Sequence, residues 1–278
     1  MFLSGASFRR RVVASFLGLL MLAAGCSDSG PWTPTPTDGP SARGDMSFVC
    51  NDEIGFFIWG GALPPSGVGR RVFSDGAILR SDGWSEIPNG PMTARGNAGA
   101  IAINNGIFVW GGSGSVVAAT DPEDFDFPTD GGIYDVDAQS WKLVPPAPLY
   151  GRPDPKLAVA RAEVLIYGPP APQSPAWQKP AAAIFDIDRM EWRNVKPPPA
   201  EAFVVGVNDE FVAFGDGMML RYSDPDDDWQ PADIVGEASI GTLTAAFPSE
   251  DGGVLLFQPD ATLRYNPVSE EVALIGKG

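Results

Sequence analysis

The feature that most constrains this chain is a hairpin pattern that recurs along it. In the clearest copy, an apolar run over residues 100–103 leads into Asn104-Asn105-Gly106, and a second apolar run over residues 107–110 ends at Gly111-Gly112. Asn and Gly tolerate the positive φ angles of tight hairpin turns, and the flanking residues are β-branched or aromatic. Similar runs occur at residues 47–59, 100–110, 157–167, 203–214 and 244–257. The pattern therefore predicts five β-hairpins.

A second hairpin is expected after each of the first ones. These hairpins cover residues 77–87, 132–144, 182–195, 219–231 and 262–275. In three of them an aromatic residue lies seven positions before a tryptophan, namely Tyr134 and Trp141, Phe185 and Trp192, and Tyr222 and Trp229. Residues 46–278 provide roughly 47 residues for each unit, within the ~40–50 residues of a propeller blade. We therefore expect one four-stranded antiparallel unit, repeated five times.

The glycine pairs and the aromatic-to-tryptophan spacing together resemble the kelch repeat. Gly60-Gly61 and Gly111-Gly112 are full pairs, and the pattern weakens towards the C-terminus. The resemblance implies an all-β, kelch-type β-propeller of about five four-stranded antiparallel blades over residues 46–278, with the aromatic residue and the tryptophan packed between neighbouring blades. The other interpretation is a different all-β repeat or a sandwich. Kelch propellers usually have six or seven blades, so five blades depart from the family. We therefore expect one of three arrangements: a closed five-bladed ring, an open arc, or a ring completed by a second chain.

The N-terminal residues have the pattern of an export signal. Arg9-Arg10-Arg11 precedes an apolar run over residues 12–24, and Leu22-Ala23-Ala24-Gly25-Cys26 resembles a bacterial lipobox. Residues 1–25 are thus expected to be a lipoprotein signal peptide, with lipid attached to Cys26. The alternatives are a plain signal peptide or an uncleaved anchor. The predicted location is the bacterial cell envelope, lipid-anchored in a membrane, with the folded domain outside the cytoplasm.

Residues 26–45 are expected to be the lipidated cysteine and a tether rich in Pro and Thr, because such a composition favours extended chain over a packed core. The chain contains only two cysteines. If Cys26 carries lipid, Cys50 has no partner within the chain, and its apolar neighbours predict a buried thiol. The adhesion tripeptide Arg43-Gly44-Asp45 is too short to be informative.

The chain is strongly acidic. Loss of the three signal arginines takes its formal charge from −16 to −19. This balance opposes nucleic acid and anionic headgroups, so the membrane contact should be made by the acyl chains alone. The sequence predicts no oligomeric state.

The chain has no histidine, which excludes the commonest general base, the usual catalytic triads and imidazole ligands for metals. The copper radical oxidases known on some kelch propellers need imidazole ligands for the metal, so this activity is excluded as well. No cofactor is expected. One loop is a candidate calcium site through Asp121, Asp124, Asp126 and Asp130, although its spacing departs from that of a calcium loop, and such turns are ordinarily solvated.

Two arginines are candidate ligand contacts. Arg95 and Arg152 each stand just before a new unit, where many kelch repeats also carry an arginine, and in a propeller this position is near one mouth of the channel. There they could clamp a carboxylate, as the resemblance to kelch-type sialic acid mutarotases suggests, or they could hold loops by hydrogen bonds. Phe125, Phe127 and Trp177 lie in long loops on one face and are candidate partner contacts.

These observations favour an exported binding or scaffold module that recognises a protein or a glycan through propeller loops. The alternative is an enzyme that modifies a sugar acid at the channel mouth, in the manner of a mutarotase or epimerase. A third class is a structural spacer of the envelope. Fold analogy alone does not choose among them.

Overall fold

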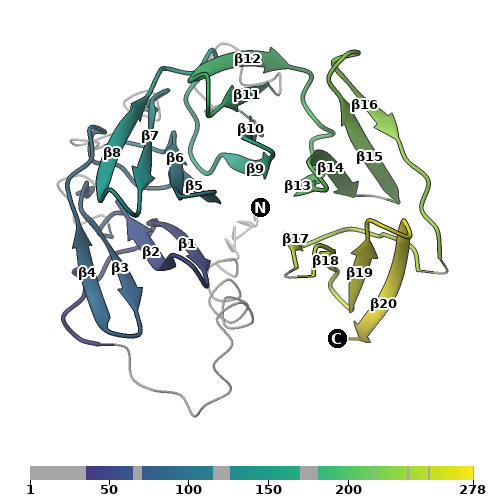
Figure 1. Ribbon diagram of the computed structural model, residues 1–278, viewed down its shortest axis with the longest axis horizontal. Coiled ribbons are helices and arrows are strands. Elements are labelled where there is room, and N and C mark those ends of the chain that lie inside the picture. The colour runs from purple at the N-terminus through teal and green to yellow at the C-terminus, as the bar shows by residue number, and fades with distance from the viewer. Residues whose placement is uncertain are drawn as a thin grey trace, which may run out of the picture.

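The computed structural model describes residues 36–64, 71–114, 126–169, 181–215, 217–236, 238–249 and 251–277. Within these ranges the chain is all-β and contains no helix, so no described helix is long and apolar enough to cross a membrane. The strands form five four-stranded antiparallel sheets, which are the blades of a five-bladed β-propeller (Figure 1). The predicted fold class and the predicted number of blades are confirmed.

Each blade uses four consecutive strands, in order from the channel outwards. The strands are, in blade 1, β1 (Ser47–Asn51), β2 (Gly55–Trp59), β3 (Gly76–Arg80) and β4 (Gly83–Ile87); in blade 2, β5 (Gly99–Ile103), β6 (Gly106–Trp110), β7 (Gly131–Asp135) and β8 (Ser140–Val144); in blade 3, β9 (Lys156–Ala160), β10 (Glu163–Tyr167), β11 (Ala182–Asp186) and β12 (Glu191–Val195); in blade 4, β13 (Phe203–Val207), β14 (Glu210–Gly215), β15 (Met218–Ser223) and β16 (Asp228–Pro231); and in blade 5, β17 (Ala245–Pro248), β18 (Val254–Phe257), β19 (Ala261–Asn266) and β20 (Glu271–Lys277).

The core lies between the blades. Four apolar clusters fill the four seams from blade 1 to blade 5, and each combines one face of a blade with the facing side of the next. In the first seam, for example, Phe57 and Trp59 pack with Ile107 and Val109. The inner strands β1, β5, β9, β13 and β17 also pack on one another in this order. Among the described residues no such cluster joins blade 5 to blade 1, and Figure 1 shows the strands of these two blades apart, so we call the seam between them, as far as the described residues form it, the open seam.

The spacing of aromatic residue and tryptophan has a physical explanation in the strand register. Tyr134 on β7 pairs directly with Trp141 on β8, and their ring centroids are 5.2 Å apart. The indole Nε1 of Trp141 donates a hydrogen bond of 2.8 Å to the carbonyl oxygen of Pro88, which follows the outer strand of blade 1. Trp192 donates in the same way to Pro145 at 2.8 Å. Each tryptophan therefore links its own blade to the end of the preceding one.

The glycine pairs turn the chain out of the sheet. Gly111 and Gly112 have φ angles of 70° and 95°, which disfavour any residue with a Cβ. A Cβ at Gly112 would also lie 2.7 Å from the carbonyl oxygen of Gly96. The backbone explanation for these glycines is thereby confirmed.

The chain just before β1 packs on blade 1. The indole Nε1 of Trp84 donates a 3.2 Å hydrogen bond to the carbonyl oxygen of Pro36, and Gly44 exchanges two backbone hydrogen bonds with Ala62. The expectation that Cys50 is unpaired is wrong for this structure: Cys50 is disulfide-bonded, and its partner lies outside the described residues.

Candidate functional site

The antiparallel order of the strands gives the propeller two different faces. The β1–β2 and β3–β4 turns, with their equivalents in the other blades, lie at one end of the blades, which we call the turn face. The β2–β3 loops and the links between blades lie at the other end, the loop face. Arg95 and Arg152 belong to the links between blades and therefore to the loop face.

Both arginines are buried beneath the loop face. Arg95 is 1% exposed, and its Nη1 donates to the carbonyl oxygen of Gly111 at 3.3 Å and to Asp130 Oδ1 at 2.8 Å. Arg152 is 0% exposed, and its Nη1 donates to the carbonyl oxygen of Gly168 and, at 3.0 Å, to that of Ala181. Burial lowers the pKa of Arg152 to about 10. Each arginine thus ties the end of a second strand to the start of the third.

Arg43 is a third member of this set, which the sequence analysis missed. Its Nη1 donates to the carbonyl oxygen of Gly60 at 3.2 Å and to Asp75 Oδ1 at 2.8 Å, and hydrogen bonding to Arg43 lowers the pKa of Asp75. The sequence signal was present, because Ser41-Ala42-Arg43-Gly44-Asp45 parallels Thr93-Ala94-Arg95-Gly96-Asn97. The tripeptide Arg43-Gly44-Asp45 is therefore part of the repeat.

The remaining candidates on the loop face are only partly described. Phe127 is half-buried, and its carbonyl oxygen lies against Gly151, while Phe125 and Trp177 lie outside the described residues. Of the calcium candidates, Asp121 and Asp124 also lie outside them. Asp126 is exposed, and Asp130 forms an ion pair with Arg95. The described residues contain no group of three or more acidic or cysteine side chains that could hold a metal ion.

The turn face contains a cavity of about 500 Å³ at the mouth of the channel. Its lining comes from the inner hairpin turns of four successive blades. The polar lining residues are Asn51, Glu53, Asn104, Arg161 and Asp209, and the apolar ones are Ala102, Ile103, Val159 and Ala160. We call this feature the mouth cavity.

The backbone fixes the polar groups of the mouth cavity. Arg161 and Asp209 have φ angles of 54° and 64°, which place them at the tips of their turns. The side-chain Oδ1 of Asn51 accepts a 2.7 Å hydrogen bond from the backbone N–H of Ile54. The sequence analysis did not single out these positions as a site, and the signal that could have found it is a polar residue at the same turn in four units.

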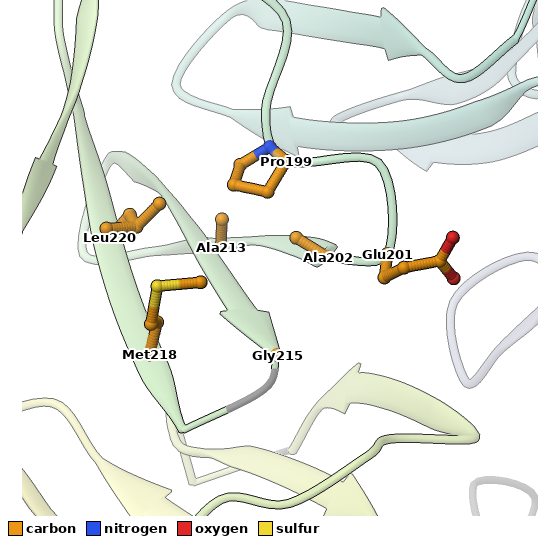
Figure 2. A pocket seen from close by; sticks show the side chains of 7 residues that line it. All are labelled: Pro199, Glu201, Ala202, Ala213, Gly215, Met218 and Leu220. Atoms are coloured by element: carbon orange, nitrogen blue, oxygen red, sulfur yellow. The ribbon is translucent and has the colours of Figure 1, made fainter.

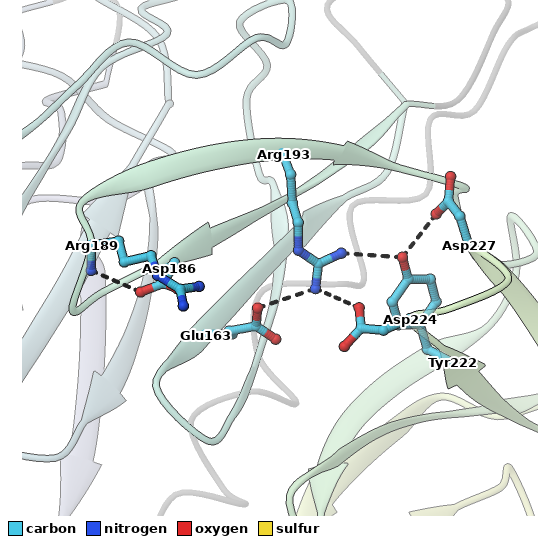
Figure 3. A network of polar contacts seen from close by, with 7 residues as sticks. All are labelled: Glu163, Asp186, Arg189, Arg193, Tyr222, Asp224 and Asp227. Atoms are coloured by element: carbon cyan, nitrogen blue, oxygen red, sulfur yellow. Dashed lines mark hydrogen bonds and ion pairs between the residues drawn. The ribbon is translucent and has the colours of Figure 1, made fainter.

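A polar network links blades 3 and 4 on the turn face (Figure 3). Arg193 on β12 forms ion pairs with Glu163 of its own blade at 3.1 Å and with Asp224 of blade 4 at 2.6 Å. Its Nη1 also donates to the hydroxyl of Tyr222, which in turn donates to Asp227 at 2.8 Å. Burial, together with the bond to Asp227, raises the pKa of Tyr222 to about 12. The network fixes blade 4 against blade 3, so the lining turns of these two blades keep their separation.

A second hollow, near Pro199 and Gly215, is no candidate site. Its cavity volume is about 20 Å³, close to the space that one water molecule needs. Six of its seven lining residues are apolar or glycine, and Figure 2 shows the carboxylate of Glu201 pointing away from the others.

Comparison with known proteins supports the fold. No protein-family model matches the chain, and no curated protein sequence matches it. The solved structure of YjhT aligns with a TM-score of 0.58 and 14% sequence identity, over 84% of this chain and 84% of that one. At this identity the likeness shows the β-propeller fold and nothing finer.

Proposed function

We propose that this protein is a kelch-type binding module, exported and lipid-anchored in the bacterial cell envelope, which holds a segment of a glycan or a protein in the mouth cavity. The observation that carries the proposal is the cavity itself, because it gathers five polar residues from four blades beside four apolar ones. Binding sites on propellers combine a rigid scaffold with exposed turns and loops in the same way. The loop-face aromatics remain a second, predicted contact surface.

The chemistry of the mouth cavity favours recognition over turnover. Glu53 and Asp209 accept hydrogen bonds, Arg161 donates them, and Asn51 and Asn104 can do both. Together these donors and acceptors suit the hydroxyl and amide groups of a glycan or a peptide. The sugar-acid enzyme needs Arg95 and Arg152 to meet a carboxylate, but both are buried and bonded to main-chain carbonyls. The geometry therefore supports the binding module better than the enzyme.

The test is a ligand screen with two arginine variants. Purified protein is titrated by calorimetry with neutral glycans, sugar acids and peptides, and a binder is then measured against Arg161→Ala and Arg189→Ala. Arg189 lies on the same face but in an outer turn, where it pairs with Asp186, so its loss should leave affinity unchanged. A ligand bound in the mouth cavity should lose about tenfold or more in affinity with Arg161→Ala. Equal affinity of the two variants would contradict the site, and turnover of a sugar acid would favour the enzyme.

Lipid attachment is tested by mass spectrometry of the membrane-bound protein. A thioether-linked lipid on Cys26 would leave this cysteine unable to pair with Cys50, which is disulfide-bonded in this structure. The lipidated protein and the disulfide-bonded protein therefore have different masses and different free-thiol counts. We expect a lipidated N-terminal peptide that begins at Cys26. An intact disulfide in protein from the envelope would contradict the anchor.

A further inference from the structure

The open seam leaves an aromatic surface on blade 1. Phe48, Phe56 and Trp84 form a ladder across the face of blade 1 that does not pack on blade 2, with ring centroids 6.4 Å and 6.5 Å apart. Phe48 is 44% exposed. Phe56 and Trp84 are half-buried, and the indole of Trp84 packs on Gly39, so Phe48 is the exposed end of this ladder.

Blade 5 presents a matching surface on the other side of the open seam. Val254 and Leu256 face blade 4, so Leu255, Phe257 and their neighbour Phe247 lie on the opposite face. Phe247 is 50% exposed, and its ring stands edge-on to that of Phe257 at 6.0 Å. Phe257 ends β18 as Trp59 ends β2 and Trp110 ends β6.

The chain that approaches this seam has the sequence of the end of a blade. Trp32 stands four residues before Pro36, as Trp84 stands before Pro88 and Trp141 before Pro145. The resemblance continues past the proline, because Arg43 follows Pro36 by seven residues, as Arg95 follows Pro88 and Arg152 follows Pro145.

The described part of this segment already behaves like a link between blades. The carbonyl oxygen of Pro36 accepts the indole hydrogen bond of Trp84, the same bond that Pro88 accepts from Trp141. Arg43 ties the second and third strands of blade 1, as Arg95 does in blade 2. Residues 36–45 therefore take the place of a link that would follow the outer strand of a blade before blade 1.

We propose that residues 31–35 dock in the open seam as the outer strand of an incomplete blade, with Trp32 packed against Phe257 and Phe247. In the sealed seams the outer-strand tryptophan packs on the last residue of the second strand of the preceding blade. The ring centroids of Trp141 and Trp59 are 5.9 Å apart, and those of Trp192 and Trp110 are 6.4 Å apart. The same register places Trp32 opposite Phe257.

The composition of the segment suits this position. An outer strand that lacks inner neighbours has no ladder partner for its N–H groups, so Pro34 and Pro36 cost nothing there, as prolines do on an edge. The indole supplies the apolar surface that holds the segment in place. The proposal does not depend on the mouth cavity or on lipid at Cys26.

The experiment compares Trp32→Ala with Thr33→Ala in the full chain by hydrogen exchange. Neighbouring side chains of an extended segment point to opposite sides, so Thr33→Ala is a matched control. We expect Trp32→Ala to speed amide exchange about tenfold in β17, β18 and β1, and Trp32→Phe to restore most of the protection. Unchanged exchange in Trp32→Ala, or an equal effect of Thr33→Ala, would overturn the proposal.

A photo-crosslinking amino acid at position 32 identifies what lies against the segment. We expect a crosslink to residues 245–257 within the same chain. A crosslink between two chains would overturn the proposal and would identify a second copy as the occupant of the seam. A crosslink confined to other blades would overturn it as well.

Discussion

Arg152 shows how a charged residue can be a structural part of a propeller. Its guanidinium is fully buried, and its Nη1 donates to the main-chain carbonyls of Gly168 and Ala181, at the glycine exit and just before β11, while its Nη2 has no hydrogen-bond partner among the described residues. An isolated buried charge is costly, and charge-assisted hydrogen bonds offset part of that cost. Through Nη1 the arginine therefore stabilises the loop end of its blade.

Arg152→Ala should lower the free energy of unfolding by about 2–4 kcal/mol, because two part-buried carbonyls lose their donor and the buried side chain leaves a cavity. Arg189→Ala, at an exposed site, should change it by less than about 0.5 kcal/mol. Urea denaturation of both variants measures the difference. A stable Arg152→Ala protein that gained or lost ligand affinity would instead indicate a binding role for this arginine.

Tyr167 gives a prediction about alkaline pH. Burial raises its pKa to about 12, and its hydroxyl accepts a 2.8 Å hydrogen bond from the backbone N–H of Val204. The unfolded chain releases the tyrosine proton near pH 10, so the stabilisation is complete below about pH 10 and is lost as the pH rises towards about 12. In Tyr167→Phe the free energy of unfolding should fall less steeply over this interval. If the free energy of unfolding fell equally steeply with pH in Tyr167→Phe and in the unchanged protein, the raised pKa of Tyr167 would be contradicted.

The four-stranded blade is the element that sequence reasoning predicted best. Its hairpins, its glycine exits and its aromatic–tryptophan pairs depend on contacts between strands that are close in the sequence, so the pattern of residues specifies them. The mouth cavity depends on which turns meet across blades, and the pattern within one unit does not record that. The repeat did single out Arg95 and Arg152, either as ligand contacts or as residues that hold loops, but their burial depends on how the loop end of the blade packs. Arg43 was missed because its proline-rich surroundings were interpreted by composition rather than by register.

Glycine substitutions separate the two reasons for the glycine exits. Gly112→Ala and Gly252→Ala both place an alanine at positive φ, 95° and 79°, but only at Gly112 would the new Cβ meet backbone, at 2.7 Å, whereas at Gly252 it meets nothing within 4 Å. Gly252→Ala should cost about 1 kcal/mol of stability, and Gly112→Ala about 2 kcal/mol more. Thermal denaturation of both variants measures the costs, and equal costs would contradict the close approach of Gly112 to the main chain at Gly96.

At the scale of the whole molecule, the described residues pack four of the seams between blades and leave the one between blades 5 and 1 without a packed cluster. In repeat proteins each unit is stabilised by its neighbours, so terminal units open more readily than central ones. Blades 2, 3 and 4 have neighbours on both sides, whereas blades 1 and 5 have one packed neighbour each among the described residues.

Hydrogen exchange of the native protein should therefore be slowest in β6 and β10 and fastest in β17 and β19. The strands β6 and β10 carry residues with no exposed surface, such as Val109 and Leu165. Mass spectrometry of peptides from each blade measures this gradient. Uniform protection of all five blades would show that the ring is sealed in solution.

The hydrogen bond from each of these tryptophans to the link that precedes its blade also has a consequence for folding during synthesis. Trp84 needs Pro36, Trp141 needs Pro88, and Trp192 needs Pro145, so every blade docks on residues that were synthesised before it. A chain that emerges with its N-terminus first can add blades one at a time, each onto a finished surface. Only the contact between the last blade and the N-terminal segment has to wait for the end of synthesis.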